Sequence, residues 1–245
     1  MNARQLQKRL REMGDPAAAA TCARYFKTGP GESGEGLEFL GISACDLRAV
    51  AKEYRAMPLD EIAKSLQSRW HDERAAALIV LTLQFPKADG ATQKSIYDLY
   101  LANTHRVNSW ALVDTSAPQI VGGYLFDKSR KPLAKLAKSK LLWDRRIAMV
   151  STQHFIRKND FADTLRIAKM LLRDKEDLIH KASGWMLREV GDRDRAMLEG
   201  FLRQHLDKMP RTMLRYAIEK FEPPRRKAHL TGTIKSALSR STSAI

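Results

Sequence analysis

The chain has few cysteines and no long apolar run, and each absence excludes a class of protein. Only two cysteines occur, Cys22 and Cys45, and they form no CxxC pair, so neither a disulfide framework nor a cysteine metal site is expected. No stretch approaches the roughly 18 to 20 apolar residues of a membrane-spanning helix. The first 14 residues carry closely spaced charges and lack the apolar core of a signal peptide. We therefore expect a cytoplasmic protein.

Motifs for metals and nucleotides are also missing or incomplete. The six histidines are scattered without HExxH spacing, so we expect no metal and no organic cofactor. The segment 26–37 contains a formal GxGxxG, but no predicted strand precedes it, and its glutamates Glu32 and Glu35 would repel a pyrophosphate. We interpret this segment as a connecting loop.

Acidic residues are scarce relative to basic ones. The chain has 43 Lys and Arg against 28 Asp and Glu, a net charge of +15. Such an excess favours a nucleic acid or another anionic surface as partner, although a basic surface without a partner is the simpler alternative. The densest positive run lies at 128–146, and several of its lysines fit an ordinary solvated helix face.

Hydrophobic periodicity and capping residues predict helices nearly throughout and no strand. Asp15 with Pro16, then Ser43 and Pro58, mark three helix starts. Further helices are predicted at 70–85, 91–102, 110–121, 130–138, 142–157, 161–172, 177–190, 194–206 and 210–221. The sequence therefore predicts an all-α fold with one repeat domain over 1–221. The acid-free, basic segment 222–245 reads as a disordered tail.

A basic or aromatic residue recurs at nearly constant spacing along the helices. The residues Arg74, Trp110, Arg146, Lys181 and Arg215 are 36, 36, 35 and 34 positions apart. A period in this range is typical of stacked helical repeats, whose equivalent positions line one concave surface. A recurring cation or aromatic ring on that surface would suit a polyanion.

Two short patterns contain candidate functional residues. Trp110 and Asp114 are four apart, so a helix places them on one face. The alternative is that Trp110 is a packing residue and Asp114 caps a helix starting at Thr115.

Lys181, Trp185 and Arg188 form a second stripe, with an aromatic ring between two cations, which suits a sugar-phosphate backbone. The opposite face, with Ile179, Ser183, Met186 and Val190, is predicted to be buried. A half-buried tryptophan under extended basic side chains remains the alternative here.

Taken together, these segments resemble the AlkD-type DNA alkylation repair proteins, a superfamily of HEAT-like repeat DNA glycosylases. The resemblance runs up to Phe221 through YFKTGPGESGEGLEFLGI, WHDERAAALIVL, NSWALVDTSAP, LLWDRRIA, HKASGWMLREV and MPRTMLRYAIEKF. The family's WxxxD pair matches Trp110 and Asp114, its WxxR arginine matches Arg146, and its GWxLRE tryptophan matches Trp185. A right-handed superhelix with a concave groove for DNA is implied.

The resemblance implies a monomeric hydrolase that cleaves the N-glycosidic bond of cationic alkylpurines, chiefly 3-methyladenine and 7-methylguanine, in duplex DNA and without base flipping. Asp114, Trp110 and Trp185 are then the predicted catalytic residues. The predicted DNA contacts are Arg146, Lys181, Arg188, Arg145 and Arg74. The alternative function is a binding protein for branched or distorted DNA that cleaves no bond, and a weaker one is a scaffold for an acidic protein.

Overall fold

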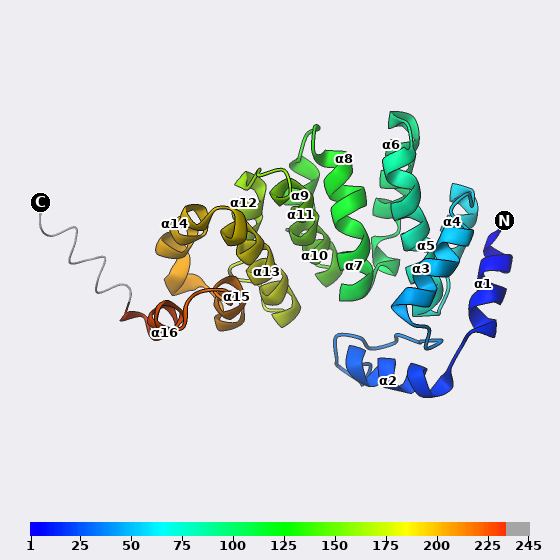
Figure 1. Ribbon diagram of the computed structural model, residues 1–245, viewed down its shortest axis with the longest axis horizontal. Coiled ribbons are helices and arrows are strands. Elements are labelled where there is room, and N and C mark those ends of the chain that lie inside the picture. The colour runs from blue at the N-terminus through cyan, green and yellow to red at the C-terminus, as the bar shows by residue number, and fades with distance from the viewer. Residues whose placement is uncertain (234–245) are drawn as a thin grey trace, which may run out of the picture. The chain divides into compact units, whose positions relative to one another are not determined.

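The computed structural model describes residues 1–233, and within them all regular structure is helical apart from one isolated bridge between Glu38 and Trp70. The predicted all-α class is confirmed. The chain divides into two compact units, residues 1–147 and residues from 148 onward, which are described separately below. Figure 1 traces the order of the helices by colour.

Unit 1 begins with α1 (Ala3–Glu12), which sequence reasoning left unassigned. Asn2 and Gln5 form a capping box at its start, and Leu6 and Leu10 bury its apolar face. The predicted starts at Asp15, Ser43 and Pro58 are confirmed as the N-caps of the next three helices. These are α2 (Pro16–Phe26), α3 (Ala44–Glu53) and α4 (Leu59–Leu66).

The centre of unit 1 is α5 (His71–Gln84), which packs against α3, α4 and α7. Its small residues Ala76 and Ala77 are completely buried, so neighbouring helices can approach closely. After α6 (Gly90–Ala102) comes α7 (Trp110–Ala117). The helix continues through a π-helical turn at Pro118–Gly122 into α8 (Gly123–Leu125), because Pro118 has no N–H for the regular ladder.

The predicted helix at 130–138 is shorter, α9 (Lys131–Leu136), and is followed by α10 (Leu142–Ser151). A single helix was predicted to run from residue 142 to 157. The helix is instead interrupted at Thr152, and a short helix, α11 (Gln153–Ile156), follows. Unit 2 then adds α12 (Ala162–Met170), α13 (Asp177–Arg193), α14 (Arg195–His205) and α15 (Arg211–Ala217).

In unit 2 the long helix α13 packs against α12, α14 and α15. Gly184 allows α15 to approach α13 closely, because a Cβ there would lie 2.5 Å from the carbonyl oxygen of Met213 on α15. The segment after Glu222, predicted to be disordered, instead forms α16 (Pro223–Thr231). Its His229 is buried against the ring of Phe221, which gives this basic segment an apolar anchor. Positions 234–245 of the predicted tail lie outside the described residues.

Candidate functional site

Trp110 and Asp114 lie on the first turns of α7, as their spacing predicted. Ser109 caps this helix by accepting a hydrogen bond from the Leu112 N–H at 3.2 Å. Trp110 is the first helical residue and Asp114 the fifth, so the two lie one turn apart on the same side. Because the helix begins at Trp110, the alternative in which Asp114 caps a helix at Thr115 is wrong.

The carboxylate of Asp114 is held by Arg146 of α10. Arg146 Nε donates to Asp114 Oδ1 at 2.9 Å, and Nη2 donates to Oδ2 at 2.7 Å. The Arg146 side chain is only 6% exposed, whereas the Asp114 side chain retains 19%. Burial raises the pKa of Asp114, and the hydrogen bonds and positive charge of Arg146 oppose that rise. Arg146, predicted to contact DNA, thus directs two guanidinium N–H groups at the Asp114 carboxylate.

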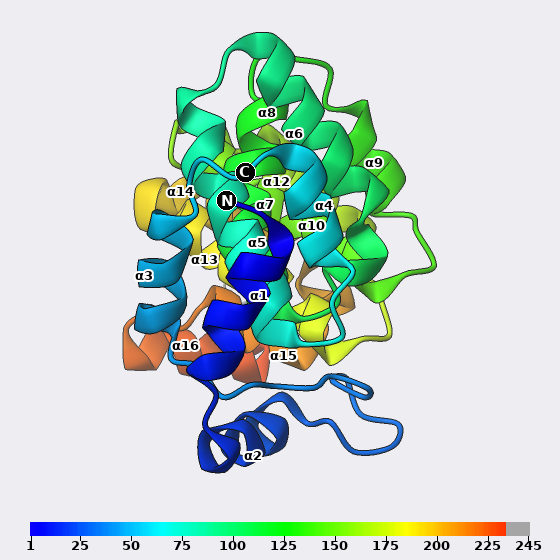
Figure 2. The same cartoon turned by 90° about the vertical axis from the view of Figure 1, so that its right-hand side faces the viewer.

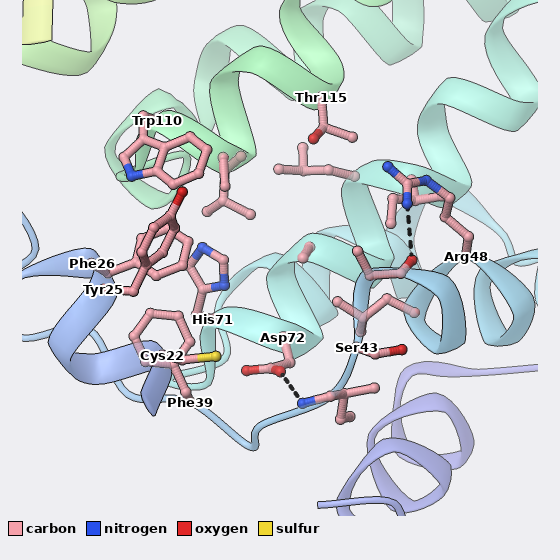
Figure 3. A pocket seen from close by; sticks show the side chains of 18 residues that line it. Cys22, Tyr25, Phe26, Phe39, Ser43, Arg48, His71, Asp72, Trp110 and Thr115 are labelled. Atoms are coloured by element: carbon pink, nitrogen blue, oxygen red, sulfur yellow. Dashed lines mark hydrogen bonds between the residues drawn. The ribbon is translucent and has the colours of Figure 1, made fainter. Parts of the chain in front are cut away.

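Two aromatic rings contact Trp110 and two more pack behind them, and none of the four contacts was predicted from the sequence. Phe26 at the end of α2 stacks on the indole, with ring centres 5.0 Å apart and planes at 12°. Tyr25 meets it edge-on at 5.8 Å and is itself 69% exposed. His71 and Phe39 in turn pack against Phe26. The indole is therefore fixed in orientation by a helix that lies far from it in the sequence (Figure 3).

The first turn of α5 supports the loop that precedes Trp110. His71 Nε2 shares a hydrogen bond of 2.8 Å with the Ser109 hydroxyl, and Arg74 Nη2 donates to Asn108 Oδ1 at 3.0 Å. Burial, with a smaller contribution from the charge of Arg74, lowers the pKa of His71 to about 3, so the imidazole is neutral at pH 7. Arg74 is only 2% exposed. It therefore holds protein groups, and its predicted contact with DNA phosphate is not available in this arrangement.

Arg74 also reveals the true register of the repeat. Its Nη1 donates to the carbonyl of Ser68, six residues earlier, at 2.8 Å. Arg145 makes the equivalent bond to Ser139 at 3.1 Å, and His180 Nε2 contacts the carbonyl of Asp174 at 2.7 Å. Arg74, Arg145 and His180 are each the fourth residue of their helix, and each side chain binds the backbone carbonyl six residues earlier. We call these three equivalent residues tethers.

Two of the cations predicted to recur, Arg146 and Lys181, do not coincide with these tethers. Arg146 and Lys181 each stand one residue after a tether, at Arg145 and His180 respectively. The predicted equivalence of Arg74 and Arg146 is therefore displaced by one residue. Arg145, predicted as a DNA contact, is half-buried and serves as a tether.

Helix α13 carries the second predicted stripe within unit 2. Its buried face contains Ile179, Ser183, Met186 and Val190, as predicted. On the opposite side, the ring nitrogen of Trp185 donates to Glu189 at 3.0 Å.

The two cations of that stripe both have acidic partners. Lys181 pairs with Asp177 at 2.9 Å, and Arg188 pairs with Glu219. The Lys181 side chain keeps 39% of its surface exposed, against 20% for Arg188. Lys181 is therefore more accessible to an anionic ligand than Arg188.

The glycine-rich segment 26–37 uses its own acidic side chains as caps. The Gly29 N–H donates to Glu32 and the Gly31 N–H to Glu35, both at 2.9 Å. Amides that a phosphate would need are thereby occupied by carboxylates, which agrees with a connecting loop. Across residues 1–233 no group of three His, Cys, Asp or Glu side chains is placed to hold a metal ion. Over the same residues, no helix has the length and apolar character to cross a membrane.

Comparisons with known proteins show the fold and the family of the chain. A solved structure from Enterococcus faecalis, described as a predicted DNA alkylation repair enzyme, superimposes with a TM-score of 0.66 over 86% of this chain and 97% of its own, at 16% identity. At that identity the likeness concerns the fold. No curated protein sequence matches the chain. The family model described as DNA alkylation repair enzyme matches residues 6–221. The chain belongs to the DNA alkylation repair enzyme family.

Proposed function

We propose that this protein is a DNA glycosylase that hydrolyses the N-glycosidic bond of cationic alkylpurines, such as 3-methyladenine and 7-methylguanine, in duplex DNA. The observation that carries the proposal is the Asp114 carboxylate, which Arg146 holds through two hydrogen bonds while part of its surface stays open. Burying a carboxylate carries a desolvation penalty in folding free energy, whereas a fixed carboxylate stabilises positive charge that develops in a transition state.

The chemistry of the substrate explains why one carboxylate suffices. An alkylpurine with a positively charged ring is already a good leaving group, so no general acid is required. As the bond breaks, positive charge moves to the deoxyribose, and a fixed anion beside the sugar stabilises that charge. Asp114 also orients the attacking water. Arg146 is then a positioning residue that keeps the carboxylate ionised and aimed.

The remaining roles follow the family resemblance and the exposure of the side chains. Trp110 and Trp185 contact the sugar, where an indole face adds a cation–π contribution of about 0.5 to 2 kcal/mol. Lys181 and Arg188 bind backbone phosphates after exchanging their acidic partners for DNA. The base remains stacked in the duplex, because the protein grips the backbone and sugar.

Release of 7-methylguanine from methylated duplex DNA tests the proposal. Wild-type protein should release the base well above the spontaneous rate, and Asp114→Asn should lower single-turnover release by 100-fold or more, on the order of an electrostatic catalytic group. DNA affinity should change by less than threefold, because Asn keeps the shape of the side chain. Asp127→Asn is the matched control, since Asp127 is an exposed acid that pairs with its neighbour Lys128.

Two outcomes would contradict the glycosylase. Release by the wild-type protein at the spontaneous rate would exclude it, and tight binding to branched DNA in the same preparation would then favour the non-catalytic alternative. Equal loss of release in Asp114→Asn and Asp127→Asn would show that the Asp114 site has no special role.

A further inference from the structure

A cavity of about 440 Å³ lies beside Trp110 in unit 1. Side chains from α2, α3, α5 and α7 form its walls, and the segment 39–42 closes one side (Figure 3). The walls are predominantly apolar and aromatic, with Phe26, Phe39, Leu78 and Trp110 among them. An apolar cavity of about 150 Å³ is large enough for benzene. This cavity has the volume of a ligand site for a molecule of two or three rings.

The buried polar groups in the walls have partners within the protein. Asp72 accepts hydrogen bonds from the backbone N–H groups of Leu40 at 2.9 Å and Ile42 at 3.0 Å. His71, as described above, is bonded to Ser109. Neither group needs a polar ligand to satisfy it, so the cavity favours an uncharged apolar molecule.

The cover of the cavity is α2, which lies across one end of the neighbouring helices of unit 1 (Figures 1 and 2). This helix has no buried residue. Its start is attached through a hydrogen bond from the Asp15 N–H to the Leu40 carbonyl at 2.9 Å, and its end through the stacking of Phe26 on Trp110. Because α2 has no buried residue, it can open locally at a lower cost than the core helices and admit a ligand.

We propose that this cavity binds a neutral, planar aromatic molecule of two to three rings, in contact with Trp110. Aromatic walls favour such a ligand because rings stack on or meet one another edge-on at little cost in conformational entropy. The proposal does not depend on glycosylase activity, since it concerns a free small molecule and uses neither Asp114 nor Arg146.

The neutral fluorophore N-phenyl-1-naphthylamine tests the proposal on the full-length protein. Its emission should rise and shift to the blue on binding, with a stoichiometry of one, and tryptophan emission should fall through energy transfer. Ala75→Phe places a ring inside the cavity, and Thr115→Phe places one at its exposed rim. Each should weaken binding by tenfold or more. Ala20→Phe adds the same ring to the exposed side of α2 and should leave binding unchanged.

Circular dichroism of each variant separates a blocked cavity from a misfolded protein. Thr115→Phe is the safer variant, because position 115 is exposed and a larger side chain there disturbs no packing. No fluorescence change up to the solubility limit of the fluorophore would overturn the proposal. Binding that Ala75→Phe and Thr115→Phe leave intact in folded protein would also overturn it, because the fluorophore would then sit elsewhere on the surface.

Discussion

Arg146 binds Asp114 across 32 positions of sequence, with both hydrogen bonds of a forked pair between 2.7 and 2.9 Å. The guanidinium is more deeply buried than the carboxylate. Arg146 was expected to bind a DNA phosphate, but its guanidinium donates both of these hydrogen bonds to Asp114. Of the two side chains, the carboxylate is the more exposed. This relationship makes Asp114 an oriented anion, which is the property that the proposed reaction needs.

Replacing Arg146 should move the pH dependence of the reaction. Burial raises the pKa of Asp114 and Arg146 lowers it, so Arg146→Gln should raise that pKa further. Because the reaction needs the ionised carboxylate, activity falls as pH drops through the pKa, and the acid limb should shift to higher pH in the variant. The pH profile of single-turnover base release measures this shift.

Arg146→Lys provides the matched comparison. A lysine keeps the charge but loses the bidentate geometry, so the acid limb should shift less than in Arg146→Gln. Both variants should lose stability, Gln by about 3 kcal/mol because a largely buried carboxylate is left without its partner. An acid limb that stays in place in folded Arg146→Gln would argue that another group controls the profile.

Substitutions of Arg74 and of Lys181 should change the salt dependence of DNA binding differently. Lys181→Gln should make the dependence of log affinity on log salt shallower by about 0.9, the value for one phosphate contact. Arg74→Gln should leave this slope unchanged, because its guanidinium is buried and bonded to Asn108 and to loop carbonyls. It should instead lower the free energy of unfolding by about 3 kcal/mol. A reduced slope in folded Arg74→Gln would restore it as a phosphate contact.

Several elements of this structure were predictable because their signals are local. The caps Asp15 and Ser43 mark helix starts within a few residues. The shared face of Trp110 and Asp114 follows from helical spacing alone. The buried side of α13 was equally readable, since its apolar positions repeat with the helical period.

Other features depend on contacts between distant segments, which a local pattern does not encode. Sequence shows that Arg74 and Arg146 are cations but not that each is buried with a specific acceptor. Likewise, no spacing rule links Tyr25 or Phe26 to Trp110, because they belong to separate elements joined only in the fold. The basic segment at 223–231 looked disordered by composition, but its Arg225 pairs with Glu199 of α14, a contact that its own sequence does not encode.

His71 should make the protein sensitive to acid. The pKa of His71 is about 3 in the folded state, below its ordinary value of 6.5, so the unfolded chain binds an extra proton between these values. Stability from this group is therefore complete above about pH 6.5 and falls as pH decreases toward 3. At pH 4.5 the loss should be about 2 to 3 kcal/mol.

His71→Gln should remove that part of the acid sensitivity, because glutamine can still bond to Ser109 but does not titrate. Urea unfolding at pH 7 and pH 4.5 measures the difference for each protein. His105→Gln, at an exposed position, should behave like wild type. If His71→Gln loses as much stability as wild type over this interval, the acid sensitivity arises from other groups.

Gly34 should be essential for the support of Trp110 by α2. A Cβ at this position would lie 2.2 Å from the carbonyl oxygen of Phe26 and 3.0 Å from that of Lys27. Both are backbone atoms, so Gly34→Ala must displace the end of α2 and with it the ring that stacks on the indole. We expect a loss of about 1 to 3 kcal/mol in unfolding free energy, together with a changed near-ultraviolet dichroism of Trp110.

Gly90→Ala is the control for the same chemical change. Gly90 is the first residue of α6 and has no atom within 4 Å of the added Cβ, so alanine should be neutral or slightly stabilising there. In a Trp110→Phe background the dichroism change caused by Gly34→Ala should disappear. The loss of stability should persist there, because the strain lies in the backbone of residues 26–34. Equal stability of Gly34→Ala and Gly90→Ala would mean that the loop adjusts without cost, and α2 would then not be held in place by this turn.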